Sequence, residues 1–352
     1  MTNLADIKIN VEKGEKPELF TAMRKYWHAV AYSGQLKDKP LGVTLLGESV
    51  VIARLNGEIR AMHGRCPHKG TALALGDVVD GKIECPYHGW QFDGGGKCVR
   101  VPAREELTEG MNVSIDCYYA AEHVGIIWVA LEKPIAPLPD FPELSDPSFR
   151  IQQGPSYEWA TSAPRRLENF VDFAHFPYVH DGTIGARDNP AVETVKVWRE
   201  GHVLRFDRSG YLPPNPDLYK FLFPVRETDR VTPVNAYHIF LPATVHASFR
   251  MPNDKRYVLF MSASPVTEDL TRIFWWQARD FRTEPMEDRF FIELEDTILG
   301  EDKAIIESQR PKWFSFNGEN RDDRETPVRG SDIVSIEYRR WLFENFTASQ
   351  KS

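Results

Sequence analysis

The sequence predicts an α+β protein in which a small all-β domain precedes a larger domain built on an antiparallel sheet covered by helices. Three observations support this fold class. Short apolar runs alternate with turn dipeptides between residues 42 and 131. Five prolines between residues 134 and 147 then suit an extended linker. Strand-like runs followed by a long amphipathic segment complete the chain. We therefore expect two domains in the 352 residues, 1–135 and 136–352.

The first domain is expected to begin with a short helix and to continue as strands. The helix is predicted over Glu18–Trp27, after a proline. The runs Val50–Leu55 and Ile59–His63 flank Asn56-Gly57, a dipeptide that favours a tight β-hairpin. The run Val124–Leu131 is apolar throughout apart from one glycine and predicts a buried strand that closes the domain.

The second domain is expected to contain helices at both ends of a series of strands. A helix is predicted near Pro164–Phe176, since Ser162 can cap it and proline suits its first turn. Strands are predicted between Val195 and Arg279, and a long helix from about Glu287 to Gln309.

Composition and charge exclude several classes of protein. The formal net charge of −8 argues against non-specific binding to nucleic acid or to an anionic membrane, since both require a cationic surface. The N-terminal segment lacks the apolar core of a signal peptide, and Val124–Leu131 is too short to span a bilayer. We expect a cytoplasmic protein. Its four cysteines are then better explained as metal ligands or buried thiols than as disulfides.

The densest chemical signal is a pair of short motifs, Cys66-Pro67-His68 and Cys85-Pro86-Tyr87-His88-Gly89-Trp90. Two thiolates and two imidazoles can bind a metal without help from the rest of the chain. Structural zinc is one possibility, because it also accepts two Cys and two His. Each motif here supplies one Cys and one His, which fits a [2Fe–2S] cluster with two Cys on one iron and two His on the other.

These motifs resemble the Rieske domain of ring-hydroxylating and demethylating oxygenases. Rieske proteins of respiratory complexes usually carry one more Cys in each loop, where this chain has Thr71 and Tyr87. The resemblance implies that Cys66, His68, Cys85 and His88 bind a Rieske [2Fe–2S] cluster. The segment from Arg60 to Arg104 holds seven Lys or Arg against four Asp or Glu. This excess suggests a docking surface for an acidic electron donor, although an ordinary solvated surface is an equal alternative.

A second motif follows in the larger domain, running from Glu168 to His180. Asp172 and His175 lie three residues apart and would share one face of the predicted helix. Pro177 disfavours continuing that helix, and the resulting bend would turn His180 toward His175. Two His and one carboxylate with open positions form the facial triad of non-haem Fe(II) enzymes.

The Asp-x-x-His-x-x-x-x-His pattern resembles the catalytic signature of the same oxygenases. The resemblance implies that His175 and His180 ligate a mononuclear iron. It also implies that Asp172 bridges His175 to a Rieske histidine of a neighbouring subunit, here His88. Alternatively, Asp172 only forms a salt bridge on the predicted helix.

The third iron ligand is predicted in the long C-terminal helix. Four apolar residues and one glutamine recur at helical spacing and form an inward stripe, namely Phe291, Leu294, Ile298, Ile305 and Gln309. Asp302 falls on this stripe, where a carboxylate is costly unless it is paired or bound to metal. Glu295 is a weaker candidate on the same stripe, and Asp296 lies well off it. The segment Gly300–Gln309 also resembles the one that supplies the aspartate ligand in these oxygenases.

The resemblance covers nearly the whole chain and implies a helix-grip-like catalytic domain in a homo-oligomer, commonly a trimer. The group with vanillate O-demethylase, dicamba demethylase and methylxanthine N-demethylases is the most similar in length. This implies O2-dependent monooxygenation, as hydroxylation or O- or N-demethylation, of a small aromatic or heterocyclic substrate. Electrons would come from NAD(P)H through a ferredoxin, a flavin-containing reductase or both.

Three alternatives stay open: a cis-dihydroxylating dioxygenase, a Rieske electron-transfer protein without oxygenase activity, and a zinc-stabilised binding module. The segments Ile184–Val192 and Leu212–Leu218 are predicted to form lids over the substrate. The sequence does not single out the residues that line the substrate pocket.

Overall fold

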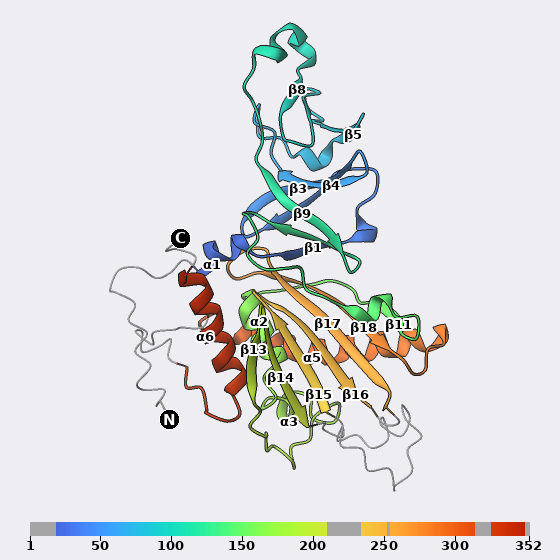
Figure 1. Cartoon of the computed structure of the whole chain (residues 1–352), viewed down its shortest axis with the longest axis vertical. Coiled ribbons are helices and arrows are strands. Elements are labelled where there is room, and N and C mark those ends of the chain that lie inside the picture. The colour runs from blue at the N-terminus through green and yellow to red at the C-terminus, as the bar shows by residue number, and fades with distance from the viewer. Residues whose placement is uncertain (1–18, 210–233, 252–253, 314–324, 349–352) are drawn as a thin grey trace, which may run out of the picture. The chain divides into compact units, whose positions relative to one another are not determined.

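The computed structural model describes residues 19–209, 234–251, 254–313 and 325–348, which form two compact units (Figure 1). One unit comprises Met23–Asp140 and the short segment Ser264–Glu268. The other comprises Leu19–Ala22, Phe141–Ala263 and the chain from Asp269 onward, as far as these residues are described. The division at Asp140 falls inside the proline-rich stretch. The predicted class, an all-β domain followed by an α+β domain, is confirmed.

The first unit contains two antiparallel sheets. The six-stranded sheet has the order β1-β10-β9-β4-β3-β2 and consists of β1 (His28–Tyr32), β2 (Leu41–Leu45), β3 (Glu48–Leu55), β4 (Glu58–His63), β9 (Cys117–His123) and β10 (Ile126–Ala130). The four-stranded sheet consists of β5 (Asp77–Val79), β6 (Lys82–Glu84), β7 (Gln91–Phe92) and β8 (Cys98–Arg100). All five residues of β10 are buried, and the strand is paired on both sides.

The predicted hairpin is confirmed, and the predicted closing strand is shorter than expected. Strands β3 and β4 pair through Asn56-Gly57, and both turn residues have positive φ, as such a turn requires. The closing strand was predicted to include Val124, which instead lies in the turn between β9 and β10 with a φ of 49°. Val124 and Gly125 together form this turn, so the apolar run contains both a turn residue and a strand.

The second unit is built on one antiparallel sheet of eight strands. Its order is β11-β18-β17-β16-β15-β14-β13, and β12 also pairs with β18. The strands are β11 (Arg150–Gln153), β12 (Tyr157–Trp159), β13 (Val197–Glu200), β14 (Val203–Ser209), β15 (Val234–Phe240), β16 (Thr244–Arg250), β17 (Arg256–Pro265) and β18 (Thr271–Arg279). Strands β11 and β12 were not predicted, because they directly follow the proline-rich segment and are short.

The helices of this unit are α1 (Leu19–Ala22), α2 (Ala163–Phe170), α3 (Phe176–Val179), α5 (Asp288–Ser308) and α6 (Ile333–Ala348). In the part of the chain that the structure describes, no helix combines the length and the apolar composition needed to cross a membrane. Helix α1 was expected in the first domain, but it belongs to the second unit. There the ring of Phe20 packs edge-on against Trp313, with 6.2 Å between centroids.

The helix predicted near Pro164–Phe176 is present as α2 but ends at Phe170, and Phe176 begins the separate helix α3. The Ser162 hydroxyl caps α2 as predicted, since it accepts a hydrogen bond from the Arg165 N–H at 3.3 Å. The helix ends at Phe170, and the Asp172 carboxylate then accepts a hydrogen bond from the Ala174 N–H, which competes with helical pairing. Pro177 starts α3 rather than ending a helix, because a proline in the first turn loses no helical hydrogen bond.

Helix α5 agrees with its predicted span, but its buried stripe differs from the predicted one. The buried residues are Phe291, Glu295, Leu299, Asp302 and Ile306. Ile305 is 48% exposed, and Gln309 is an exposed residue beyond the helix, so both were wrongly placed inward. Leu294 and Ile298 are half-buried. The inward face therefore carries two carboxyl groups, seven residues apart.

Two glycines of the second unit should respond to alanine in opposite directions. A Cβ at Gly154, whose N–H donates to the Trp275 carbonyl, would lie 1.8 Å from Trp275 Cε2. We expect Gly154→Ala to lower the unfolding free energy by about 1–3 kcal/mol through this overpacking. Gly300 is an exposed residue of α5 with open space around it, so Gly300→Ala should raise stability by up to about 1 kcal/mol. Thermal denaturation of both variants tests the pair, and equal shifts would contradict it.

Candidate metal centres

The two Cys-His motifs form matching loops in the first unit. The first loop follows β4, and the second follows β6. In each loop the Cys carbonyl accepts a hydrogen bond from the glycine four residues later, from Gly70 at 2.8 Å and from Gly89 at 3.0 Å. Each Cys N–H donates to the carbonyl of the residue five later, at 2.9 Å in the first loop and 2.8 Å in the second. Both glycines have positive φ, which lets each loop fold back on its cysteine.

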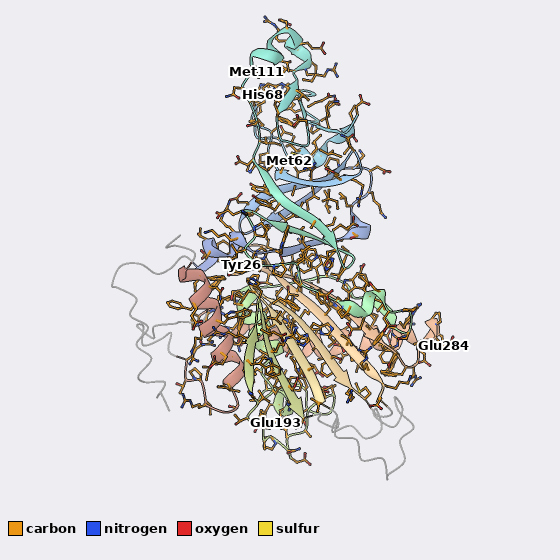
Figure 2. The ribbon with its side chains drawn as sticks, in the orientation of Figure 1. Tyr26, Met62, His68, Met111, Glu193 and Glu284 are labelled. Carbon is orange, nitrogen blue, oxygen red and sulfur yellow. The ribbon has the colours of Figure 1, made fainter. Side chains whose placement is uncertain are left out.

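The cysteines and the histidines of these loops lie in different environments. Cys66 and Cys85 are buried in the core of the unit, and their thiols are in hydrogen-bonding contact. Burial raises the pKa of Cys66 to about 11. His68 and His88 are exposed, with 4.5 Å between their ring centroids. Figure 2 labels His68 close to the place where Figure 1 labels β8, away from the labels of β3 and β4.

This arrangement fits a two-iron cluster better than a single zinc ion. The ligands of one tetrahedral zinc ion lie within about 4 Å of one another, given bonds of about 2.0–2.3 Å. No three of these four side chains have ligand atoms that all lie within 4.8 Å of one another, although all four are described. They form a buried thiol pair and an exposed imidazole pair, the division that a Rieske [2Fe–2S] cluster requires.

A second group of ligands converges in the second unit. His175 Nε2, His180 Nε2 and Asp302 Oδ1 lie 3.2–3.3 Å from one another. Three ligands around one ion with bonds of about 2.1 Å are separated by about 3.0–3.4 Å. Within the described residues, only this group of His, Cys, Asp or Glu has ligand atoms close enough to share one ion. His175 precedes α3, His180 follows it and Asp302 comes from α5.

The charge distribution at this group favours a cation. Burial alone would lower the pKa of His175, but Asp172 and Asp302 outweigh it and raise that pKa to about 9. Burial also opposes ionisation of Asp302, yet the two histidines and Arg166 hold the pKa of that carboxyl well below its usual range. The side chain of Asp302 is 7% exposed. A buried carboxylate beside two imidazoles therefore attracts positive charge, a proton or a metal ion.

Three further side chains hold the ligands in place. The Glu301 carboxylate lies 2.7 Å from His180 Nδ1, which leaves Nε2 free to face the other ligands. The Asn169 side-chain amide donates to Asp302 Oδ1 at 3.2 Å, and Arg166 Nη1 donates to Asn169 Oδ1 at 2.7 Å. None of these three side chains was predicted from the sequence. Nothing in the residue pattern around Asn169 indicates its contact with Asp302. Glu301 could have been noted because it is the sequence neighbour of the predicted ligand Asp302.

Asp172 is more exposed than Asp302 and Glu301, with 39% of its side chain accessible. Its Oδ2 lies 3.8 Å from His175 Nδ1, which is too long for a direct hydrogen bond. That nitrogen has no hydrogen-bond partner in the structure. Oδ1 accepts from the Ala174 N–H, and the carboxylate as a whole is accessible to a group from outside the unit.

A cavity of about 210 Å³ opens beside the three ligands. Its wall is mainly aromatic and aliphatic, with residues from α2, α5 and strands β15 to β17. Most of its rings belong to Phe170, Phe173, Phe176, Tyr237, Phe249, Tyr257, Phe281 and Phe291. Of the two predicted lids, Ile184 contributes to the wall, and Leu212–Leu218 lies outside the described residues. The mononuclear centre thus borders a site for a largely apolar molecule.

Glu295, the weaker candidate for the third ligand, lies two turns before Asp302 and is not one of the converging groups. It lines the same cavity and is 6% exposed. The Tyr257 hydroxyl lies 2.7 Å from Glu295 Oε1. Burial raises the pKa of Glu295 to about 7, and the hydrogen bond from Tyr257 only partly opposes this rise.

Comparison with known proteins gives two family matches. Residues 26–118 match the Rieske [2Fe-2S] domain, and residues 159–346 match the vanillate O-demethylase oxygenase C-terminal domain. The chain is 32% identical to the methylxanthine N1-demethylase NdmA of Pseudomonas putida, over 92% of this chain and 89% of that protein. It is 31% identical to the methylxanthine N3-demethylase NdmB of the same organism, over 91% and 89%.

Solved structures agree with these matches. The structure of Pseudomonas putida CBB5 NdmA with caffeine has a TM-score of 0.84 at 31% identity, covering 95% of this chain and 94% of that one. Dicamba monooxygenase bound to dicamba has a TM-score of 0.77 at 22% identity, covering 94% and 99%, and so shares the fold.

The buried Glu295 carboxyl predicts a pH-dependent loss of stability. A carboxyl with a folded-state pKa above its unfolded value of 4.5 stabilises most when protonated. Its contribution therefore falls as pH rises from 4.5 through about 7, by on the order of 3 kcal/mol in total. Relative to Glu295→Gln, the wild type should lose unfolding temperature between about pH 5 and about pH 8. A difference between the two proteins that does not change with pH would contradict the assignment.

Proposed function

Since the chain belongs to the Rieske non-haem iron oxygenases, we propose that it is the terminal oxygenase of a multicomponent system that oxidises a small aromatic or heterocyclic substrate. One observation carries this proposal: His175, His180 and Asp302 converge beside an apolar cavity in a chain that also holds paired Cys-His loops. A Rieske protein that only transfers electrons would have no use for the second group of ligands.

The proposed cofactors are a Rieske [2Fe–2S] cluster and one mononuclear Fe(II). Cys66, His68, Cys85 and His88 would hold the cluster, and His175, His180 and Asp302 would hold the single iron. When bound, the cluster would supply electrons and the mononuclear iron would activate O2. Glu301 and Asn169 would then keep one imidazole and the carboxylate oriented, because each bonds a ligand directly. The apolar wall would hold the substrate and exclude water.

Among oxygenase reactions, we favour monooxygenation, as hydroxylation or as oxidative O- or N-demethylation. Two relatives that match over 89% of their own length are methylxanthine N-demethylases, which supports this choice. A hydroxylated methyl group leaves as formaldehyde, whereas ring dihydroxylation, the runner-up, would leave a cis-diol. Formaldehyde released in step with O2 consumption therefore identifies demethylation, and a cis-diol product identifies dihydroxylation.

The electron donor and the assembly are further proposals. Electrons would come from NAD(P)H through a ferredoxin, a flavin-containing reductase or both, entering at the exposed His68 and His88. Arg65 and Lys69 are exposed beside these histidines, which supports docking of an acidic donor. The accessible carboxylate of Asp172 supports a homo-oligomer, most simply a trimer, in which it meets a Rieske histidine of another subunit. The expected cytoplasmic location stays a prediction.

The iron content of a ligand variant tests the main proposal. The wild type should contain about three iron and two acid-labile sulfide per chain. In His175→Ala we expect about two iron and two sulfide, an unchanged cluster spectrum and loss of product formation, because one mononuclear ligand is gone. His202→Ala, which removes an exposed histidine of the same unit, is the control and should match the wild type. Product formation that survives in His175→Ala would remove the oxygenase assignment, and zinc without sulfide in the wild type would remove both centres.

Asp172 offers a separate test of electron transfer between the centres. Asp172→Asn keeps the shape of the side chain but removes its charge, and the residue is not one of the three converging ligands. We expect iron and sulfide contents like those of the wild type, normal reduction of the cluster by the donor, and turnover at least about a hundredfold slower. Single-turnover kinetics of the pre-reduced enzyme would locate the slow step. Unchanged turnover would show that Asp172 has no bridging role.

A further inference from the structure

The helix that carries Asp302 also carries a second buried carboxyl, on the same face and in the same cavity. Glu295 lies seven residues before Asp302, which is about 10 Å along the axis of α5. Both residues line the cavity. A molecule of one or two rings that reaches the mononuclear centre at one end would therefore have its other end near Glu295.

The Glu295 carboxyl is incompletely bonded. Its one hydrogen-bond partner among the described residues is the Tyr257 hydroxyl, which engages Oε1. The same hydroxyl lies 2.9 Å from Gln277 Oε1, so its single hydrogen serves two acceptors. No Lys, Arg or His of the described chain forms an ion pair with Glu295. A carboxyl this deeply buried is costly without a further partner, and the cavity is where one can bind.

None of the arginines of the cavity wall forms an ion pair with Glu295, although Arg166 Nε, Arg166 Nη2 and Arg208 Nε have no hydrogen-bond partner among the described residues. Arg166 donates to Asn169 beneath Asp302, and it stacks on Trp159 with 4.6 Å between its Cζ and the ring centroid. Arg208 lies over the ring of Phe173 at 4.1 Å. Arg250 is mostly exposed and lies 3.9 Å from Asp254. None of these guanidinium groups neutralises Glu295. The part of the cavity around Glu295 therefore offers a hydrogen-bond acceptor and no paired cation.

We propose that Glu295, positioned by Tyr257, selects substrates that present an N–H or O–H donor at its end of the cavity and rejects those with a carboxylate there. The proposal rests on the proposed function and narrows its substrate class to nitrogen heterocycles, amines or phenols. An ionised carboxyl accepts from the donor with both oxygens, and a protonated one still offers an acceptor oxygen. A carboxylate at this end would face a buried acid with no cation to bind it.

Binding of three matched probes to the iron-loaded enzyme tests this selectivity. The probes are para-methoxyaniline, its N,N-dimethyl derivative, which lacks the N–H donor, and para-methoxybenzoate. Their dissociation constants would be measured by anaerobic titration calorimetry, so that no turnover is needed. The wild type should bind para-methoxyaniline at least about tenfold more tightly than either of the other two, since a site with a buried acceptor discriminates against a ligand that leaves it unpaired.

Two variants at position 295 and one at its neighbour test whether Glu295 causes the preference for the N–H donor. Glu295→Leu should remove the preference for the N–H donor, and Glu295→Gln, which keeps an acceptor oxygen, should retain most of it. Asp296→Asn removes a carboxylate from the exposed side of the same turn and should leave the preference unchanged. A wild type that binds para-methoxybenzoate more tightly, or does not bind para-methoxyaniline, overturns the proposal, as does a preference that survives in Glu295→Leu.

Iron analysis separates this outcome from failure of the proposed function. If the wild type and Glu295→Leu both hold the mononuclear iron and the probe preference is still absent, the selectivity inference fails alone. If the wild type holds no mononuclear iron, the proposed oxygenase function fails first, because the cavity would then border no reactive centre.

Discussion

The carboxylate of Asp302 is the constraint on which the second unit depends. A carboxylate that is 7% exposed cannot stay ionised unless positive charge lies beside it, and here two imidazoles meet it at 3.3 Å. To bring them there, the chain must end α2, turn, and start α3 between the two histidines. Asn169 and Glu301 then fix the carboxylate and one imidazole, so that the ligands are preorganised before any ion arrives.

The first unit is under a different constraint, because its proposed cluster site must be both stable and accessible to an electron donor. Burial protects Cys66 and Cys85, whereas the exposed His68 and His88 leave one edge of the site open to a partner. The two loops reach this arrangement with the same backbone hydrogen bonds around Gly70 and Gly89, so short segments place all four side chains. Electrons could enter or leave through the imidazole edge without exposing the thiolate edge to solvent.

Much of this could be predicted from the sequence, and the exceptions have physical reasons. The Cys-His loops and the group around His175 are local motifs, so their chemistry is visible in residue types and spacing. Asp302 could be chosen because a carboxylate on an apolar stripe needs a partner. The true stripe passes through Leu299 and Ile306 rather than Ile305, since small changes in helix rotation decide which of two adjacent aliphatic residues is buried. Strands β11 and β12, and the contact of Asn169 with Asp302, depend on segments more than a hundred residues apart, which periodicity cannot reveal.

Helix α5 has a consequence for how related enzymes could diverge. Seven residues return an α-helix to within about 20° of the same face, so positions 295 and 302 look into one cavity from successive levels. A replacement at position 295 leaves the proposed metal ligand Asp302, two turns away, untouched. The helix would thus let natural selection change substrate recognition at position 295 while Asp302 is kept.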